Sequence, residues 1–202
     1  MFRSALGAPS RRATRIGLVL SSAAALAAST GLVLNASYAA YSSTTNDGTN
    51  SWATGSVVLT DDDAGSAMFT ATGLKPGSTG TRCVVVTSNG TLPSAVKLYG
   101  SGLTTTNGLS GQIDLTITQG TGGSFGSCTG FTPQATGSSV YAGTLAGFTA
   151  TGYGTGLGTW APTGTPGETR TFQFTYTVRS TAPDTTQNGT ASVTFVWEAQ
   201  NT

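Results

Sequence analysis

The stretch TRTFQFTYTVR, residues 169–179, decides the fold class of this chain. Apolar side chains occupy every second position through its later part, and threonine fills most of the positions between them. The apolar set is Phe172, Phe174, Tyr176 and Val178. A period of two residues places such a set on one face of a β-strand, whereas a helix would scatter it around its axis. The stretch therefore predicts a strand with one buried face.

Other segments carry the same alternation. Residues 112–118 alternate apolar with polar side chains, and residues 191–198 bring Val193, Phe195 and Trp197 to one face. Further strands are expected at residues 56–60, 67–72, 94–99 and 140–148. About eight short strands, with no amphipathic helical pattern among them, predict an all-β fold in the form of a single jelly-roll-like β-sandwich.

A central pair of strands is predicted from residues 74–93, LKPGSTGTRCVVVTSNGTLP. Pro76 and Gly77 suit a tight turn, because proline fixes φ at the second position and glycine takes the positive φ that follows. The β-branched run at residues 82–88 predicts a strand buried on both faces. Asn89, followed by glycine, predicts a hairpin into the next strand.

Residues 1–39 have the pattern of a signal peptide. Four arginines and no acidic residue open the chain, an alanine-rich apolar stretch follows at residues 16–34, and small residues lead to Ala39. This order predicts a helical export signal that is cleaved after Ala39, which leaves residues 40–202 as the secreted domain. The apolar stretch is also just long enough to act as an uncleaved membrane anchor.

Removal of this leader changes the charge of the protein. The chain has 9 basic and 8 acidic residues, and four of the basic residues lie in the leader. The remaining five basic residues face eight acidic ones, so the secreted domain has a formal charge of −3. A mildly acidic domain without basic clusters is a poor nucleic-acid binder, and no nucleic acid is expected among the partners.

Cys83 and Cys128 are the only cysteines in the chain, and both lie in the exported part. An even pair of cysteines in an oxidising compartment favours a disulfide. Two buried free thiols are the alternative. Reactive thiols are disfavoured, because the chain has no histidine that could activate one.

The absence of histidine excludes several kinds of active site. A Ser-His-Asp triad, a Cys-His pair and the zinc-binding helix of metalloproteases all require one. Paired carboxylates could still hydrolyse a glycoside, but the candidates are interpreted as solvated surface groups. These candidates are Asp114, Glu168, Asp184 and Glu198. The sequence therefore predicts neither an enzyme nor a cofactor.

Asp61, Asp62 and Asp63 form the densest cluster of charge. Carboxylate oxygens bind calcium, but the interrupted spacing, the glycine and the distal glutamate of a hand-type calcium loop are missing. A solvated turn between two strands is the favoured interpretation.

Two aromatic residues are the remaining binding candidates. Tyr153 and Trp160 lie in a glycine-rich region, residues 120–167, that is expected to form long surface loops around one strand. They are therefore expected to be exposed and to stack on a sugar ring or dock on a partner. Trp52 and Trp197 are expected to fill the core.

Three motifs follow one another along the chain. They are AAYSSTTNDGTNSWATGSVVLTD after the alanine-rich leader, GLKPGSTGTRCVVVTSNGTLPSAVKLY in the first half of the domain and ASVTFVWEAQ near its end. In their order and spacing they resemble the TasA/camelysin family of secreted bacterial proteins. The likeness covers both ends of the domain, whereas residues 101–166 are not recognisably shared.

The resemblance implies a jelly-roll protein that a signal peptidase of the SipW type processes during export and that assembles into extracellular matrix fibres. Its implied partners are further copies of itself or a related fibre subunit. Camelysin members are described as surface metalloendopeptidases, but that activity is transferred to no residue here, because this chain has no histidine. The cysteine pair also departs from the fibre-forming members.

Residues 40–52 are expected to join the subunits. The segment is polar and separated from the first firm strand, so it can add as a strand to an exposed sheet edge of a neighbour. Fibre-forming relatives are thought to link in this way. The residues proposed for this contact are Ala40, Tyr41, Ser42, Ser43 and Thr44, with Tyr41 as the anchoring side chain.

The sequence thus predicts a structural subunit, or an accessory protein, of an extracellular or cell-surface fibre. A secreted module that binds carbohydrate or a cell-wall polymer is the alternative. A surface metalloendopeptidase is the least favoured of the three.

Overall fold

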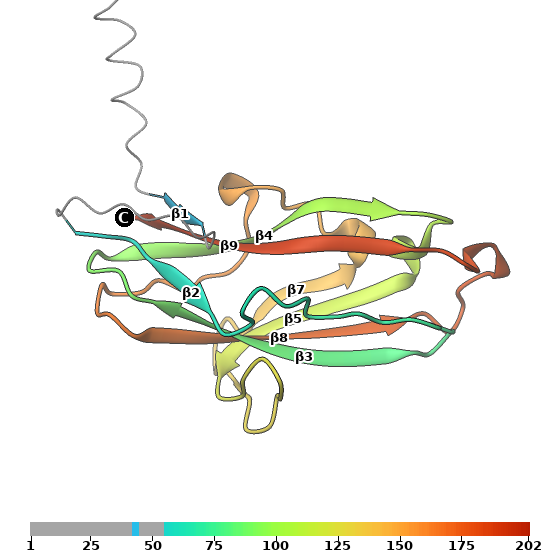
Figure 1. Cartoon of the computed structure of the whole chain (residues 1–202), viewed down its shortest axis with the longest axis horizontal. Helices are drawn as coiled ribbons and strands as arrows, with labels where there is room; N and C mark the ends of the chain where they lie inside the picture. The colour runs from blue at the N-terminus through green and yellow to red at the C-terminus, as the bar shows by residue number, and fades with distance from the viewer. Residues whose placement is uncertain (1–41, 45–54) are drawn as a thin grey trace, which may run out of the picture. The chain divides into compact units, whose positions relative to one another are not determined.

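The computed structural model describes residues 42–44 and 55–202, and the segments predicted at residues 1–41 and at Trp52 lie outside these residues. The described part is an antiparallel β-sandwich, which confirms the all-β prediction. Figure 1 shows its two layers, with β4 and β9 in one and β3, β5 and β8 in the other.

The smaller layer, called sheet A below, contains three strands in the order β1, β9, β4. They are β1 (Ser42–Thr44), β9 (Ala191–Asn201) and β4 (Ser94–Thr105). β4 and β9 pair along almost their whole length, with one irregularity between Ser101 and Thr104. Gly102 takes a φ of 67° at this irregularity, a conformation that glycine adopts without strain.

The larger layer, called sheet B, has the order β2, β3, β8, β5, β6, and β7 also pairs with β5. Its strands are β2 (Leu59–Asp61), β3 (Thr79–Ser88), β5 (Ile113–Thr121), β6 (Thr132–Pro133), β7 (Ser139–Thr144) and β8 (Glu168–Val178). All the pairings are antiparallel. β8 lies at the centre of this sheet, so one face of it meets the core and the other meets solvent, as its strict alternation predicts.

The core lies between the two sheets and is rich in aromatic side chains. Phe172 and Phe174 of β8 are buried, as is Trp197 of β9. The ring centroid of Phe174 lies 4.8 Å from that of Phe195 and 6.0 Å from that of Trp197, so these rings join the two layers. The inward faces predicted for β5, β8 and β9 are therefore confirmed.

Short 3-10 turns are the only helices in the described ranges. They are η1 (Leu109–Gln112), η2 (Leu145–Gly147), η3 (Tyr153–Thr155) and η4 (Asp184–Thr186). Across residues 42–44 and 55–202, therefore, no helix has the length and apolar character that a membrane span requires.

Asn89 and Gly90 do not form the predicted hairpin. β3 lies in sheet B and β4 in sheet A, so the chain passes from one layer to the other at this point. Neither residue takes the positive φ that a two-residue hairpin turn requires. The N–H groups of Asn89 and Thr91 instead donate to the carbonyls of Val58 and Ser56, at 2.9 and 2.8 Å.

Residues 67–72 do not form the predicted strand. They belong to the connection between β2 and β3, and Met68, Phe69 and Leu74 of this connection pack against the core as partly buried side chains. Phe69 meets the ring of Tyr176 edge-on at 5.1 Å. The side chains of this segment thus enter the sandwich although its backbone pairs with no strand.

Three further expectations need correction. The outer face of β3 is buried only in part, since Cys83 is buried whereas Val85 and Thr87 are half-buried; the inner face, with Val84 and Val86, is buried. The strand expected at residues 56–60 is β2, which begins later and includes Asp61. The glycine-rich region contains two strands, β6 and β7, and its residues 150–162 bond to β4 through main-chain groups.

Candidate functional site

Part of the predicted assembly segment already pairs as a strand. Ser42, Ser43 and Thr44 form β1, which runs antiparallel to the end of β9. Their partners in the register are Gln200, Ala199 and Glu198, respectively. Ala40 and Tyr41, including the proposed anchoring side chain, lie outside the described residues. The segment therefore makes main-chain pairing with a sheet edge, and in this structure the edge belongs to its own chain.

The two edges of sheet A differ. The outer edge of β4 is covered, because the N–H groups of Ser94, Val96, Leu98 and Gly100 donate to the carbonyls of Pro162, Trp160, Leu157 and Ala150. Since N–H directions alternate along a strand, the residues between these four face β9. By the pairing register, the odd-numbered residues of β9 then direct their main-chain groups to the opposite edge, where β1 lies.

Within the part of the chain that the structure describes, strand pairing covers the outer edge of β9 over only a small part of its length. Within the described ranges, the only strand that pairs with this edge is β1, at the three positions from Glu198 to Gln200. Val193, Phe195 and Trp197 direct their main-chain groups to the same edge. An uncovered strand edge of this kind is a template for pairing with another extended chain.

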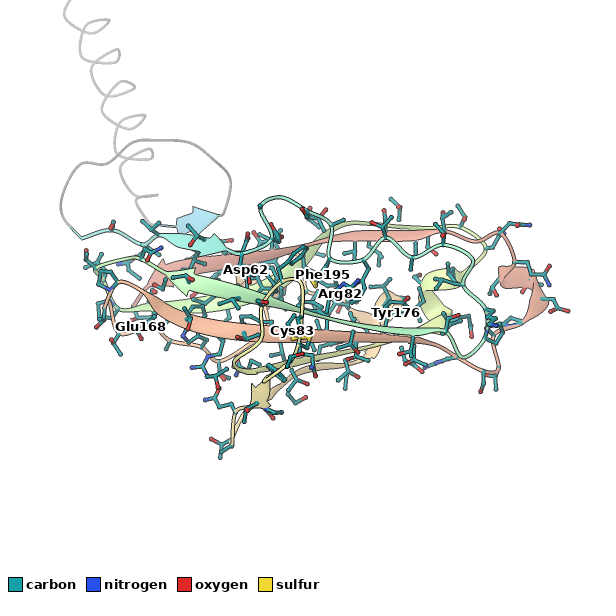
Figure 2. The ribbon with its side chains drawn as sticks, turned by 60° about the horizontal axis from the view of Figure 1, so that its bottom comes forward. Asp62, Arg82, Cys83, Glu168, Tyr176 and Phe195 are labelled. Carbon is teal, nitrogen blue, oxygen red and sulfur yellow. A yellow bond between two sulfur atoms is a disulfide. The ribbon has the colours of Figure 1, made fainter. Side chains whose placement is uncertain are left out.

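The predicted disulfide between Cys83 and Cys128 is present. The two Cα atoms lie 5.3 Å apart, and the bridge spans 45 residues of sequence. It ties β3 to the loop between β5 and β6, residues 122–131, which crosses the outer face of sheet B (Figure 2). Cys83 is 0% exposed, although it points away from the core, because this loop covers it. The bridge indicates that the protein folds in an oxidising compartment.

Asp62 makes a second tie to the same loop. One carboxylate oxygen, Oδ1, accepts the N–H of Val85 in β3, and the other, Oδ2, accepts the N–H of Phe125 in the loop, both at 2.8 Å. Figure 2 shows Asp62 beside the strand that carries Cys83. Asp62 is exposed, as predicted, but it connects two separate segments and is more than a solvated turn residue.

The neighbours of Asp62 in the sequence influence each other. Desolvation by burial, together with the nearby carboxylate of Asp63, raises the pKa of Asp61 to about 6. Asp63 also accepts the N–H of Gly65 at 2.6 Å and so closes the turn. Among the residues that the structure describes, no group of three or more cysteine, aspartate or glutamate side chains is placed to hold a metal ion.

The carboxylates considered for glycoside hydrolysis make separate local contacts. Asp114 forms an ion pair with Arg179 at 2.8 Å. Glu168 accepts the N–H of Thr163 and thereby holds the loop before β8. Glu198 accepts the hydroxyl of Tyr99 at 2.9 Å. Asp184 accepts the side-chain amide N–H of Gln187 at 3.3 Å. Each of the four carboxylates thus has a structural contact of its own.

Trp160 is buried, which contradicts its prediction as an exposed stacking residue. Only 5% of it is exposed, and its ring lies 6.0 Å from the guanidinium carbon of Arg170. Its carbonyl accepts the N–H of Val96, so the glycine-rich segment around it is held against β4. The glycines near Trp160 predict a free surface loop, and the sequence there has no period that indicates pairing with a strand.

Tyr153 is half-buried and lies against sheet A. Its hydroxyl donates to the carbonyl of Ala95 in β4 at 3.1 Å. Burial, with a smaller contribution from the Glu198 carboxylate, raises its pKa. The structure therefore does not bring Tyr153 and Trp160 together as an exposed pair, and their proposed stacking role loses its geometric basis.

Comparison with known proteins adds no family to this picture. No family model matches the chain, and no match to a curated protein is found.

Proposed function

We propose that the protein is a structural subunit, or an accessory protein, of an extracellular or cell-surface fibre in which strand addition joins the copies. The observation that carries the proposal is the pairing of β1 with the end of β9. This pairing supports the proposal that the N-terminal segment adds to a sheet edge through main-chain groups. The paired residues, Ser42 to Thr44, belong to the segment that the sequence predicts for assembly.

The same pairing can be made between two molecules. β1 contributes only three residues, so few main-chain bonds hold it to its own domain. If β1 leaves its own β9 and pairs with the β9 of a neighbour, it makes the same bonds with the same register, as in domain swapping. A contact that joins the N-terminal segment of one copy to β9 of the next is head-to-tail, and it extends a filament when the two copies do not exchange segments reciprocally.

Two further observations agree with this proposal. The disulfide fits a protein that folds outside the reducing cytoplasm, as an extracellular subunit must. The order of the sequence motifs resembles secreted fibre proteins. Secretion, membership of that family and the fibre itself are parts of the proposal.

A mixing experiment with single cysteines tests the exchange directly. Since Ala199 directs its main-chain groups to β1, Ser42 and Gln200 form a non-hydrogen-bonded pair, with Cα atoms about 4.5 Å apart. That separation suits a disulfide. We expect a mixture of Ser42→Cys and Gln200→Cys proteins to form covalent heterodimers on mild oxidation, because the partner cysteine is then always on another molecule.

The matched control for Gln200→Cys is Ser192→Cys, which is exposed on the same strand but is not opposite β1. Equal amounts of heterodimer with the two β9 variants would show random collision and would contradict the proposal.

Deletion of residues 40–50 supplies the second test, because it removes β1 entirely. The truncated protein is expected to fold and to remain monomeric in size-exclusion chromatography, whereas the complete secreted domain forms filaments visible by electron microscopy. Filaments of normal appearance from the truncated protein would overturn the mechanism.

A further inference from the structure

A shallow hollow that contains an ion pair lies at one end of the outer face of sheet B. It has a volume of about 440 Å³. Asp114 of β5, Thr177 of β8 and the residues 179–181 that follow β8 line it, together with Gly77. Because Asp114 and Thr177 are directly opposite in the register, their side chains share this outer face.

An ion pair fixes the geometry of the hollow. Nε of Arg179 donates to Oδ1 of Asp114 at 2.9 Å, and Nη2 lies 2.8 Å from the same oxygen in an ion pair. Across the described residues, Oδ2 of Asp114 and Nη1 of Arg179 have no hydrogen-bond partner. The side chains are 47% and 42% exposed, respectively. The pair thus presents one strong acceptor and one strong donor, held side by side, to solvent.

Hydroxyl groups surround this pair. Ser180 and Thr181 lie in the wall of the hollow, and the hydroxyl of Thr177 lies 3.2 Å from that of Thr79 in the neighbouring strand. Two residues further along the same two strands, the hydroxyls of Thr81 and Thr175 lie 3.1 Å apart. The surface beside the ion pair is therefore able both to donate and to accept hydrogen bonds.

The charges decide which ligand chemistry fits. Asp114 neutralises Arg179, so the hollow does not favour an anion, and Arg179 in turn disfavours a cation at Asp114. A neutral ligand with adjacent hydroxyl groups suits both free atoms. One hydroxyl donates to Oδ2 of Asp114, and the neighbouring oxygen accepts from Nη1 of Arg179.

We propose that this hollow binds a neutral saccharide through two adjacent hydroxyl groups, with Asp114 as the acceptor and Arg179 as the donor. The site is shallow and its lining contains no aromatic ring, so a single sugar unit binds weakly. A polysaccharide that repeats the unit binds many copies of the protein at once, and the effective concentration strengthens the attachment. The site does not depend on strand exchange.

Affinity electrophoresis in native gels tests the proposal with the purified protein. The probes are four neutral polysaccharides cast separately into the gel: a β-glucan, an α-glucan, a mannan and a galactan. At least one of them is expected to retard the protein, and free monosaccharide of the same type is expected to reverse the retardation.

Three variants identify the site. Asp114→Asn and Arg179→Gln each remove a charged partner, so the dissociation constant is expected to rise by about tenfold or more. Thr194→Ala is the control, because it removes an exposed hydroxyl from β9 in the other sheet. This variant is expected to bind the polysaccharide as the unchanged protein does. Circular dichroism of each variant checks that it is folded.

The charge-reversed double variant Asp114→Arg/Arg179→Asp provides a further readout. It restores the ion pair but exchanges the positions of donor and acceptor, so it is expected to fold normally and not to recover binding. Retardation by none of the four polysaccharides, or equal retardation of Asp114→Asn and the unchanged protein, would overturn the proposal. Because Asp114 and Arg179 lie outside β1 and β9, filament formation by the Asp114 and Arg179 variants is expected to be unaffected, which separates this test from that of fibre assembly.

Discussion

Reduction of the Cys83–Cys128 bridge should lower the free energy of unfolding by about 4 kcal/mol. The bridge closes a loop of 45 residues, and the chain-entropy model assigns a closed loop of that length about 4 kcal/mol at 25 °C. The effect arises in the unfolded chain, which the bridge confines. The folded loop keeps other ties after reduction, namely the contact of Asp62 with Phe125 and the pairing of β5 with β6.

Urea unfolding, followed by tryptophan fluorescence with and without a thiol reductant, measures this difference. A urea m-value of about 2 kcal/mol/M gives a shift in the unfolding midpoint of about 2 M. The Cys83→Ala/Cys128→Ala protein, which has no thiol group, should unfold near the midpoint of the reduced protein, and the reductant should not affect it. A midpoint shift below about 0.5 M would refute this reasoning, because it would mean that residues 83–128 of the unfolded chain are equally restricted without the bridge.

Three other changes test separate features. Asp62→Ala removes the acceptor for the N–H groups of Val85 and Phe125, so we expect a loss of about 1 to 2 kcal/mol, and faster hydrogen exchange at these two amides than in Asp62→Asn. The pKa of Asp61 is raised from 3.8 to about 6, so the folded protein binds this proton more tightly than the unfolded chain does. The stability of the protein should therefore fall as the pH rises from about 4 to about 6. In thermal melts, Asp61→Asn should flatten this dependence of stability on pH. Trp160→Ala should cost about 3 to 5 kcal/mol in urea unfolding, and a cost below about 1 kcal/mol would contradict its burial against β4.

The alternation of apolar and polar side chains along the sequence predicts the central strands well. β5, β8 and β9 each have one face in the core and one outside, so their side chains must alternate. The period does not encode the partner of a strand. Asn89 and Gly90 have the composition of a hairpin, yet the strands around them lie in different layers. Residues 67–72 have the composition of a strand, yet only their side chains enter the sandwich.

The candidate sites were less accessible from the sequence. Counting the cysteines was enough to find the bridge, because only one pairing exists. The two contacts of Asp62 join residues 23 and 63 positions away, and the ion pair of Asp114 joins a residue 65 positions away. Such contacts depend on the register between strands, which no local pattern specifies. The prediction for Trp160 is wrong because glycine-rich composition indicates a loop and does not show whether that loop bonds to a strand.

The unequal edges of sheet A set a limit on how this sheet can grow. Residues 150–162 occupy the main-chain groups along the first part of β4, so growth by pairing is blocked on that side. β9 offers the opposite edge, on which β1 covers only three positions of the described sheet. Sheet A can therefore accept a further strand by main-chain pairing at one edge only, the outer edge of β9, in the part that the structure describes. When two units do not exchange segments reciprocally, one acceptor edge and one extended segment per unit give unbranched, directional chains, with an unfilled acceptor edge at one end and a free segment at the other.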